Sequence, residues 1–165
     1  MREHRRPAIE GNPIFMQQAI ALSTQNVISG NGGPFGAVVV RNGEIVSTGV
    51  NLVTSINDPT AHAEIVAIRA ACRTLRSFRL NGCVVYTSCE PCPMCLAALY
   101  WSHCDAIFYG NSAADATAAG FDDSFLYDEL RRPIDQRKIP MTRLLAGEAI
   151  ENFITWRAKT DRIEY

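Results

Sequence analysis

The sequence lacks a long apolar run and a surplus of basic residues, and both absences narrow the range of functions that the protein could have. No hydrophobic stretch in the 165 residues approaches the roughly 18 residues that a membrane-spanning helix needs, so we expect no membrane partner. The formal net charge is -1, whereas proteins that bind nucleic acid backbones rely on many Lys and Arg contacts to phosphate. The composition therefore favours a small-molecule partner and disfavours nucleic acid.

A secretion signal is not expected either. The opening MREHRRPAIEGNP is basic but has no apolar core behind it, so residues 1–12 are expected to form a flexible N-terminal arm. We therefore expect a cytoplasmic protein, whose six cysteines stay reduced and serve as core residues or metal ligands. Cys72 and Cys83 lie among apolar residues, as core cysteines do.

The expected elements alternate along a single domain, residues 1–165. The patterns predict helices over 13–29, about 61–76, 93–101, 112–119 and 150–159, and strands over 37–40, 44–50, 83–87, 106–110 and 141–145. Asn42-Gly43 predicts a tight hairpin turn between the first two strands. Strands that alternate with helices indicate a largely parallel sheet covered on both faces, which is a three-layer α/β/α sandwich.

Two short motifs carry the chemistry. His62-Ala63-Glu64 and Pro91-Cys92-Pro93-Met94-Cys95 together match the zinc deaminase pattern H-x-E followed by P-C-x-x-C. In this pattern one His and two Cys bind a single zinc ion, and the Glu is the general acid and base rather than a ligand. Three protein ligands leave the fourth position of tetrahedral zinc open for water, as catalytic sites require. The sequence therefore predicts His62, Cys92 and Cys95 as ligands and Glu64 as the proton carrier.

Helix geometry explains how the two motifs reach one metal. A residue before proline avoids helical dihedral angles, so Cys92 is expected to be an N-cap with Pro93 as the first helical residue. Cys95 then lies one turn along the same face, and the helix N-terminus stabilises both thiolates. Within a helix His62 and Glu64 would point roughly 200° apart, so both are expected at the first turn. We expect this site near the carboxyl ends of the strands.

A closed structural site is the alternative to an enzyme. Cys89, Cys92 and Cys95 are evenly spaced, and with His62 they could form a Cys₃His site in a zinc-stabilised interaction module. The proline at position 91 disfavours one helix face through Cys89 and Cys92. A closed site would also give Glu64 no function.

The segments DPTAHAEIVAIRAAC and YTSCEPCPMCLAALYW resemble the cytidine-deaminase-like superfamily, and within it the small bacterial guanine deaminases. The resemblance extends from GGPFGAVVV to GFDDSFLYDEL and the terminal Tyr. It implies a five-stranded mixed sheet between helices, one zinc ion per subunit, and hydrolysis of guanine to xanthine and ammonia. Zinc-bound hydroxide would attack the amino-bearing ring carbon while Glu64 moves the protons.

The resemblance also assigns residues that would contact the base. Asn51 is expected to hydrogen-bond the base, Phe35 to pack against its ring and Ala63 to line the pocket. Asp123 would bind the amino group or assist proton transfer. Simpler interpretations stay open, because Asn51 could cap a turn, Phe35 could be a core aromatic and Asp123 could cap a helix.

The resemblance further implies a homodimer and leaves several substrates open. The C-terminal segment, about residues 146–165, would cross over and close the partner's site with Tyr165, although terminal residues often fray. The tRNA adenosine deaminases share the DPTAHAE and EPCxMC elements, but they need a basic face to hold folded RNA. Residues 148–165 carry no such basic surplus. Guanosine, cytosine and aminated triazines also fit the expected chemistry.

Overall fold

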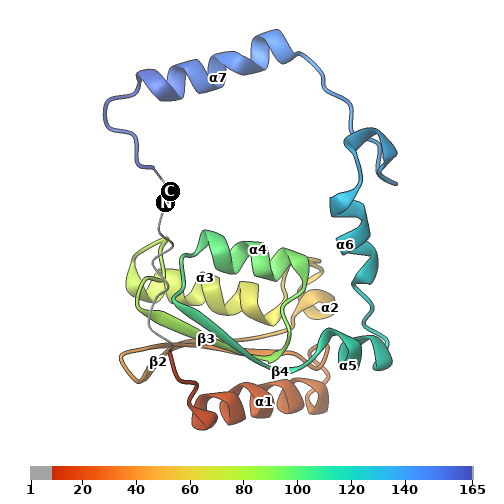
Figure 1. The fold of residues 1–165 in the computed structure, drawn as a ribbon. Coiled ribbons are helices and arrows are strands. Elements are labelled where there is room, and N and C mark those ends of the chain that lie inside the picture. The colour runs from red at the N-terminus through yellow and green to blue at the C-terminus, as the bar shows by residue number, and fades with distance from the viewer. Residues whose placement is uncertain (1–8, 165) are drawn as a thin grey trace. The chain divides into compact units, whose positions relative to one another are not determined.

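The computed structural model describes residues 9–164, and the chain divides into two compact units, up to Asp123 and from Ser124 onward. Figure 1 shows the helices and strands of both units. Residues 1–8 of the expected N-terminal arm lie outside the described residues, and residues 9–12 have no regular secondary structure. No helix within residues 9–164 is long and apolar enough to cross a membrane.

The first unit contains every strand among the described residues. Its elements are α1 (Pro13–Ile28), β1 (Gly36–Arg41), β2 (Glu44–Val50), α2 (Val53–Ile56), α3 (Ala63–Leu75), β3 (Cys83–Cys89), α4 (Pro93–Trp101), β4 (Ala106–Asn111) and α5 (Ala113–Ala118). The predicted hairpin turn is confirmed, because Asn42 and Gly43 join β1 to β2 with φ values of 53° and 79°. Positive φ at both central residues is what a type I′ turn requires.

The sheet has four strands in the order β2-β1-β3-β4. The prediction of a largely parallel sheet was wrong, because β1 is antiparallel to both β2 and β3 and only β3 and β4 pair in parallel. The helical crossovers do give β2, β3 and β4 one direction. The hairpin strand β1 lies between β2 and β3, however, and this turns two of the three ladders antiparallel. The sheet is therefore mixed, with four described strands rather than the expected five.

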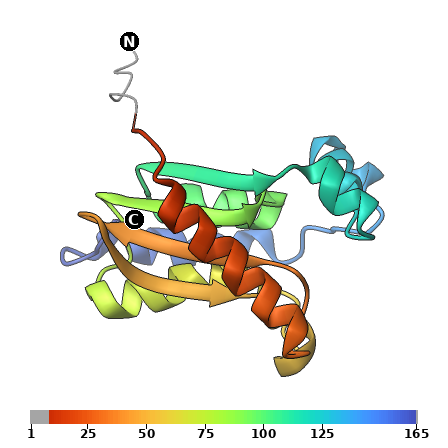
Figure 2. The same ribbon diagram turned by 90° about the horizontal axis from the view of Figure 1, so that it is seen from below.

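Helices cover both faces of this sheet. Val38, Val40 and Tyr86 pack with Ala19 of α1 on one face. The alternate strand positions, which include Ala37, Val39 and Val85, pack with α3 and α4 on the other. Figures 1 and 2 show α1 crossing the face opposite α3 and α4. The continuous run AVVV is thus explained by a central strand that is buried on both sides.

One glycine allows α3 to lie directly on the sheet. A Cβ atom placed on Gly49 of β2 would lie 2.2 Å from the carbonyl oxygen of Ala63 and 2.5 Å from the nitrogen of Ala67. Any larger residue would therefore push the helix backbone outward. This contact sets the position of the first turn of α3, which carries His62 and Glu64.

The second unit contains α6 (Ser124–Arg131), the 3₁₀ helix η1 (Ile134–Gln136) and α7 (Ala146–Ala158). The strand predicted at 141–145 is wrong, because these residues have no regular structure. A strand needs a hydrogen-bonding neighbour, and the described part of this unit contains no other strand. The final helix begins earlier than about residue 150, after Leu145 in the left-handed conformation and with Glu148 in its first turn. An acidic residue there favours a helix N-terminus.

Candidate metal centre

Two helix N-termini bring the three predicted ligands together. His62 is the N-cap of α3, with φ -67° and ψ 157°. Cys92 is the N-cap of α4, with φ -63° and ψ 167°, and Pro93 follows it as predicted. Cys95 lies on the first turn of α4. The ligand atoms of His62, Cys92 and Cys95 all lie within 4.8 Å of one another.

The spacing of these atoms fits a zinc ion. Nδ1 of His62 lies 3.6 Å from Sγ of Cys92 and 3.6 Å from Sγ of Cys95. Zinc bonds of about 2.3 Å to sulfur and about 2.0–2.1 Å to nitrogen, opened to the tetrahedral angle of about 109°, separate the two atoms by about 3.6 Å. The two nitrogen–sulfur edges therefore already have the lengths that a zinc tetrahedron requires.

The hydrogen bond between Cys92 and Cys95 makes the two thiols differ in acidity. The hydrogen bond from Cys95 is the main cause that lowers the pKa of Cys92 to about 4, and the bond to His62 adds to it. The same Cys92–Cys95 bond, together with burial, raises the pKa of the Cys95 thiol. Cys92 is therefore the more readily ionised thiol, and metal binding would displace the proton of Cys95.

Glu64 lies at the second position of α3 and is buried, with a relative exposure of 5%. The hydroxyl of Thr87 donates a hydrogen bond to its Oε1 at 3.2 Å. Burial is the main cause that raises the pKa of Glu64 above the ordinary value of 4.5, and an interaction with the Cys95 thiol opposes the rise. A carboxyl group that holds its proton more tightly than usual suits proton transfer near neutral pH.

Cys89 does not join the cluster of ligands. Its thiol donates instead to the carbonyl oxygen of Ser112 at 3.7 Å. Burial is the main cause that raises its pKa to about 11, which disfavours the thiolate that binds metal. Among the described residues the metal-binding group contains His62, Cys92 and Cys95. The closed Cys₃His arrangement therefore has no geometric support.

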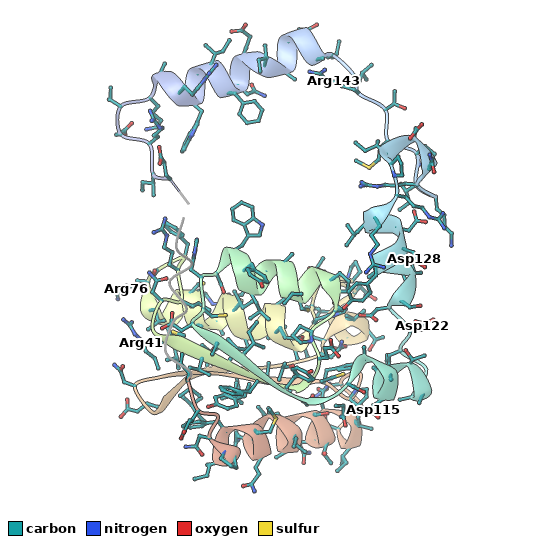
Figure 3. All side chains as sticks on the ribbon, viewed as in Figure 1. Arg41, Arg76, Asp115, Asp122, Asp128 and Arg143 are labelled. Carbon is teal, nitrogen blue, oxygen red and sulfur yellow. The ribbon has the colours of Figure 1, made fainter. Side chains whose placement is uncertain are left out.

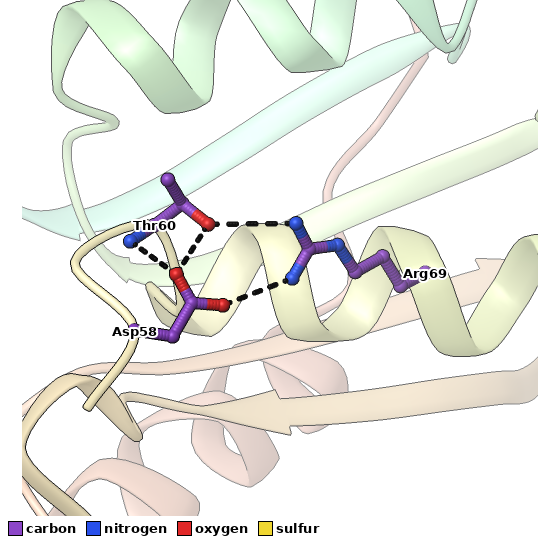
Figure 4. Close-up of polar contacts among 3 residues, drawn as sticks. All are labelled: Asp58, Thr60 and Arg69. Atoms are coloured by element: carbon purple, nitrogen blue, oxygen red, sulfur yellow. Dashed lines mark hydrogen bonds and ion pairs between the residues drawn. The ribbon is translucent and has the colours of Figure 1, made fainter. Parts of the chain in front are cut away.

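A small polar network braces the turn that precedes His62 (Figure 4). Oδ1 of Asp58 accepts hydrogen bonds from the backbone N–H and the hydroxyl of Thr60, at 2.8 and 2.7 Å. Arg69 of α3 reaches Oδ2 of Asp58 at 3.4 Å. The side-chain and backbone bonds from Thr60 lower the pKa of Asp58. These contacts tie the loop to the same helix that the histidine caps.

Asn51 follows β2 and is buried, with 8% exposure. Its Oδ1 accepts a hydrogen bond from the N–H of Val53 at 3.3 Å, which is the turn-capping contact that the sequence left open. Its backbone oxygen accepts a bond from Nδ2 of Asn26 at 2.8 Å, and the same Nδ2 donates to the oxygen of Gly33 at 2.9 Å. Asn26 therefore joins the turn at Asn51 to the loop that contains Gly33.

The other residues expected to contact the base are Phe35, Asp123, Ala63 and Tyr165, and they differ in their surroundings. Phe35 packs against the core and meets Phe121 edge to face, with ring centroids 5.0 Å apart. Hydrogen bonding to Cys92 is the main cause that raises the pKa of His62, and the charge of Asp123 adds to it. The negative charge of Asp123 therefore acts on the group formed by His62, Cys92 and Cys95. Ala63 is fully buried, and Tyr165 lies outside the described residues.

Sequence reasoning missed the residues that support the site. Thr87, Asn26 and Asp58 lie outside the two motifs that carry the chemistry, and Thr87 and Asn26 act through contacts 23 and 25 residues away in the sequence. The turn signal Asn57-Asp58-Pro59-Thr60 is visible in the sequence, and Asp or Thr in such a turn is a signal for side-chain bonds to the backbone. No comparable local signal marks Thr87 or Asn26.

Comparison with known proteins identifies the family to which this site belongs. Residues 10–111 match the family described as the cytidine and deoxycytidylate deaminase zinc-binding region. The chain belongs to this zinc-binding deaminase family. The matched residues include His62, Glu64, Cys92 and Cys95. The family resemblance in the sequence is therefore confirmed, and zinc is the metal that the family and the ligand set share.

Three relatives place the chain within this deaminase family. Guanine deaminase from Bacillus subtilis is 48% identical over 92% of this chain and 97% of its own length. Its X-ray structure matches with a TM-score of 0.92 over 94% of this chain and 99% of that chain, at 47% identity. A structure of guanine deaminase from Nitrosomonas europaea matches with a TM-score of 0.65, at 29% identity over 94% and 90%. A tRNA-specific adenosine deaminase from Aquifex aeolicus is 45% identical over 67% of this chain and 71% of its own.

Proposed function

We propose that this deaminase hydrolyses guanine to xanthine and ammonia. The full-length similarity to the Bacillus subtilis guanine deaminase, 48% identity over 92% of the chain, is the observation that carries the choice of substrate. The similarity to the tRNA-specific adenosine deaminase stops at 67% of the chain. The guanine deaminase match thus extends over a larger part of the chain.

His62, Cys92 and Cys95 are the proposed zinc ligands, because their donor atoms lie within 4.8 Å of one another and the two nitrogen–sulfur distances match a zinc tetrahedron. When bound, zinc supplies Lewis acidity that makes water a nucleophile near neutral pH. The chain contributes the thiolate of Cys92 and a second thiol, Cys95, whose proton would be released to solvent or a base on metal binding. Cys89 has no part in this site.

Glu64 is the proposed proton carrier. Its carboxylate takes a proton from the attacking water and returns protons to the ring nitrogen and to the departing amine. Burial keeps the carboxyl pKa raised, so the group can both accept and release a proton in one cycle. Guanine and water thus become xanthine and ammonia with no other reactant.

We propose Asn51, Phe35, Ala63 and Asp123 as residues that bind the base. Asn51 directly follows β2 and is buried, and Ala63 lies between His62 and Glu64. The aromatic ring of Phe35 offers a surface on which a purine can pack. Asp123 interacts electrostatically with Cys92 and His62, which suits a contact with the amino group.

We propose further that residues 1–165 act as one deaminase domain in a cytoplasmic homodimer. The segment of about residues 146–165 would close the partner's site, with Tyr165 as a contact to the base. The support is the apolar surface of α7, where Ile150, Phe153, Ile154 and Trp156 are all at least 40% exposed. Exposed apolar patches of this kind are typical of protein interfaces.

The charge around the metal centre favours a small base over RNA. Cys89 of β3 pairs with Asn111 of β4, so α5 begins at the same end of the sheet as the metal centre. Figure 3 shows Asp115 and Asp122 at this end of the first unit and Arg41 and Arg76 at the other. Acidic side chains at this end of the unit disfavour the approach of a phosphate backbone.

The decisive experiment measures ammonia release from guanine, adenine, cytosine, cytidine, guanosine and an adenosine-bearing tRNA stem-loop. We expect guanine to be much the fastest substrate, and equal or faster turnover of the stem-loop would contradict the proposal. Glu64→Gln should keep its zinc and lose about 10²–10⁴-fold in activity. A Glu64→Gln variant that kept both its zinc and the biological effect of the protein would point to the zinc-stabilised interaction module.

Two cysteine variants form a matched test of the ligand set. Cys92→Ala should lose zinc, because it removes one of three ligands. Cys89→Ala should keep one zinc per subunit, since its thiol contacts the Ser112 carbonyl instead. Metal content measured after gel filtration distinguishes the two, and zinc loss from the Cys89 variant would contradict the assignment.

A further inference from the structure

Thr87 lies at the centre of the sheet, directly below the proton carrier. It pairs with Ala37 of β1 on one side and with Tyr109 of β4 on the other. Its side chain is almost fully buried, with 1% exposure. A β-branched side chain on a strand held from both sides has little rotational freedom. The hydroxyl of Thr87 is therefore a fixed hydrogen-bond donor.

This fixed donor meets a flexible acceptor. The hydroxyl of Thr87 donates to Oε1 of Glu64 at 3.2 Å, and both groups are buried. Glutamate has three rotatable side-chain bonds, so without a partner its carboxylate would sample several positions above the sheet. The other side-chain partner of Glu64 is the Cys95 thiol, which becomes a metal ligand when zinc binds. A bond from Thr87 does not depend on the metal.

We propose that Thr87 is a positioning residue that holds the carboxylate of Glu64 in its working orientation throughout the reaction. The inference rests on the proposed deaminase function of the same site. The hydroxyl holds one oxygen of the carboxylate, and the second oxygen is then the one that exchanges protons with water and base. Thr87 contacts no reacting atom and acts only through Glu64.

Two pairs of variants isolate the hydroxyl. Thr87→Val replaces it with a methyl group of nearly the same size, and Thr87→Ser keeps it while removing the methyl. Thr87→Ala and Thr87→Ser again differ only in the hydroxyl. This second comparison replaces the first if the valine variant folds poorly. We expect kcat for guanine to fall on the order of tenfold in the Val and Ala variants. KM should change less than about twofold, and serine should restore most of kcat, because the interaction acts on catalysis rather than on binding.

Readouts other than activity separate positioning from a purely structural role. The Val variant should keep one zinc per subunit and the same oligomeric state as the wild type. A crystal structure should show the Glu64 carboxylate displaced while His62, Cys92 and Cys95 keep their places. Adding Thr87→Val to Glu64→Gln should cost far less than it costs in the wild type, since coupled residues are not additive.

The outcomes also distinguish this inference from the proposed function. If the zinc-loaded wild type releases no ammonia from guanine, both fail. If the wild type is active and the Val variant keeps its kcat, only the role of Thr87 is overturned. The same holds if the wild type is active, the Val variant loses both zinc and kcat, and the Ser variant does not restore kcat.

Discussion

Gly49→Ala tests whether the contact between β2 and α3 sets the geometry of the metal centre. The added Cβ would lie 2.2 Å from the carbonyl oxygen of Ala63 and 2.5 Å from the nitrogen of Ala67. Both atoms belong to the helix backbone, so no side-chain rotation can relieve the overlap. Ordinary carbon contacts begin near 3.4 Å, and α3 must therefore retreat by roughly 1 Å.

This retreat separates ligands that come from two different helices. His62 caps α3 and would move with it, whereas Cys92 and Cys95 belong to α4 and would stay. Metal sites tolerate changes of only about 0.2 Å in ligand distance. We expect zinc affinity to fall about 10–100-fold, as it does when supporting contacts are lost. The free energy of unfolding should fall by about 1–3 kcal/mol, the usual cost of overpacking.

Chelator competition measures the zinc affinity, and denaturant unfolding of the zinc-free protein measures the stability. Gly147→Ala is the matched control, because its Cβ would meet nothing within 4 Å. That substitution in α7 should leave zinc affinity unchanged and raise helix stability by up to about 1 kcal/mol. If Gly49→Ala binds zinc as tightly as the wild type, the β2–α3 contact does not set the position of His62.

Three further predictions concern other parts of the site. Asn26→Ala removes the amide that donates hydrogen bonds to the backbone oxygens of Gly33 and Asn51. Steady-state kinetics should show KM for guanine rising by a larger factor than kcat falls, and an unchanged KM would contradict this prediction. In zinc-free protein, burial raises the pKa of Glu64 above 4.5, so the folded state holds this proton more tightly than the unfolded state. The corresponding contribution to stability is complete below the unfolded pKa and disappears as pH rises through the folded value. Urea unfolding at several pH values should therefore show Glu64→Gln gaining stability over the wild type as pH rises above 4.5, whereas a constant difference would exclude the shift. Deletion of residues 157–165 should reduce turnover more than it reduces helix content by circular dichroism, and full activity in the shortened chain would remove the proposed role of the C-terminal segment.

The sequence predicted which residues form the ligand cluster and which helical turn carries Glu64, because both depend on local chemistry. Pro93 cannot continue a helix backward, so Cys92 must cap α4 and Cys95 must follow on its first turn. Asn42-Gly43 determines the hairpin between β1 and β2 in the same way, through the φ values that only a few residues tolerate. Such features depend on neighbours within about one helical turn, and the sequence shows those neighbours directly.

The order of the strands, the partner of Glu64 and the bonds of Asn26 were decided only by the tertiary structure. Periodicity shows which face of β1 is buried, but not that β1 lies between β2 and β3, because strand order depends on which packing buries the most apolar surface. Thr87 and Glu64 are 23 residues apart in the sequence, and their contact exists only because α3 packs on that sheet. The amino acid sequence thus determines which groups can do the chemistry, while packing over long sequence distances determines how those groups are held.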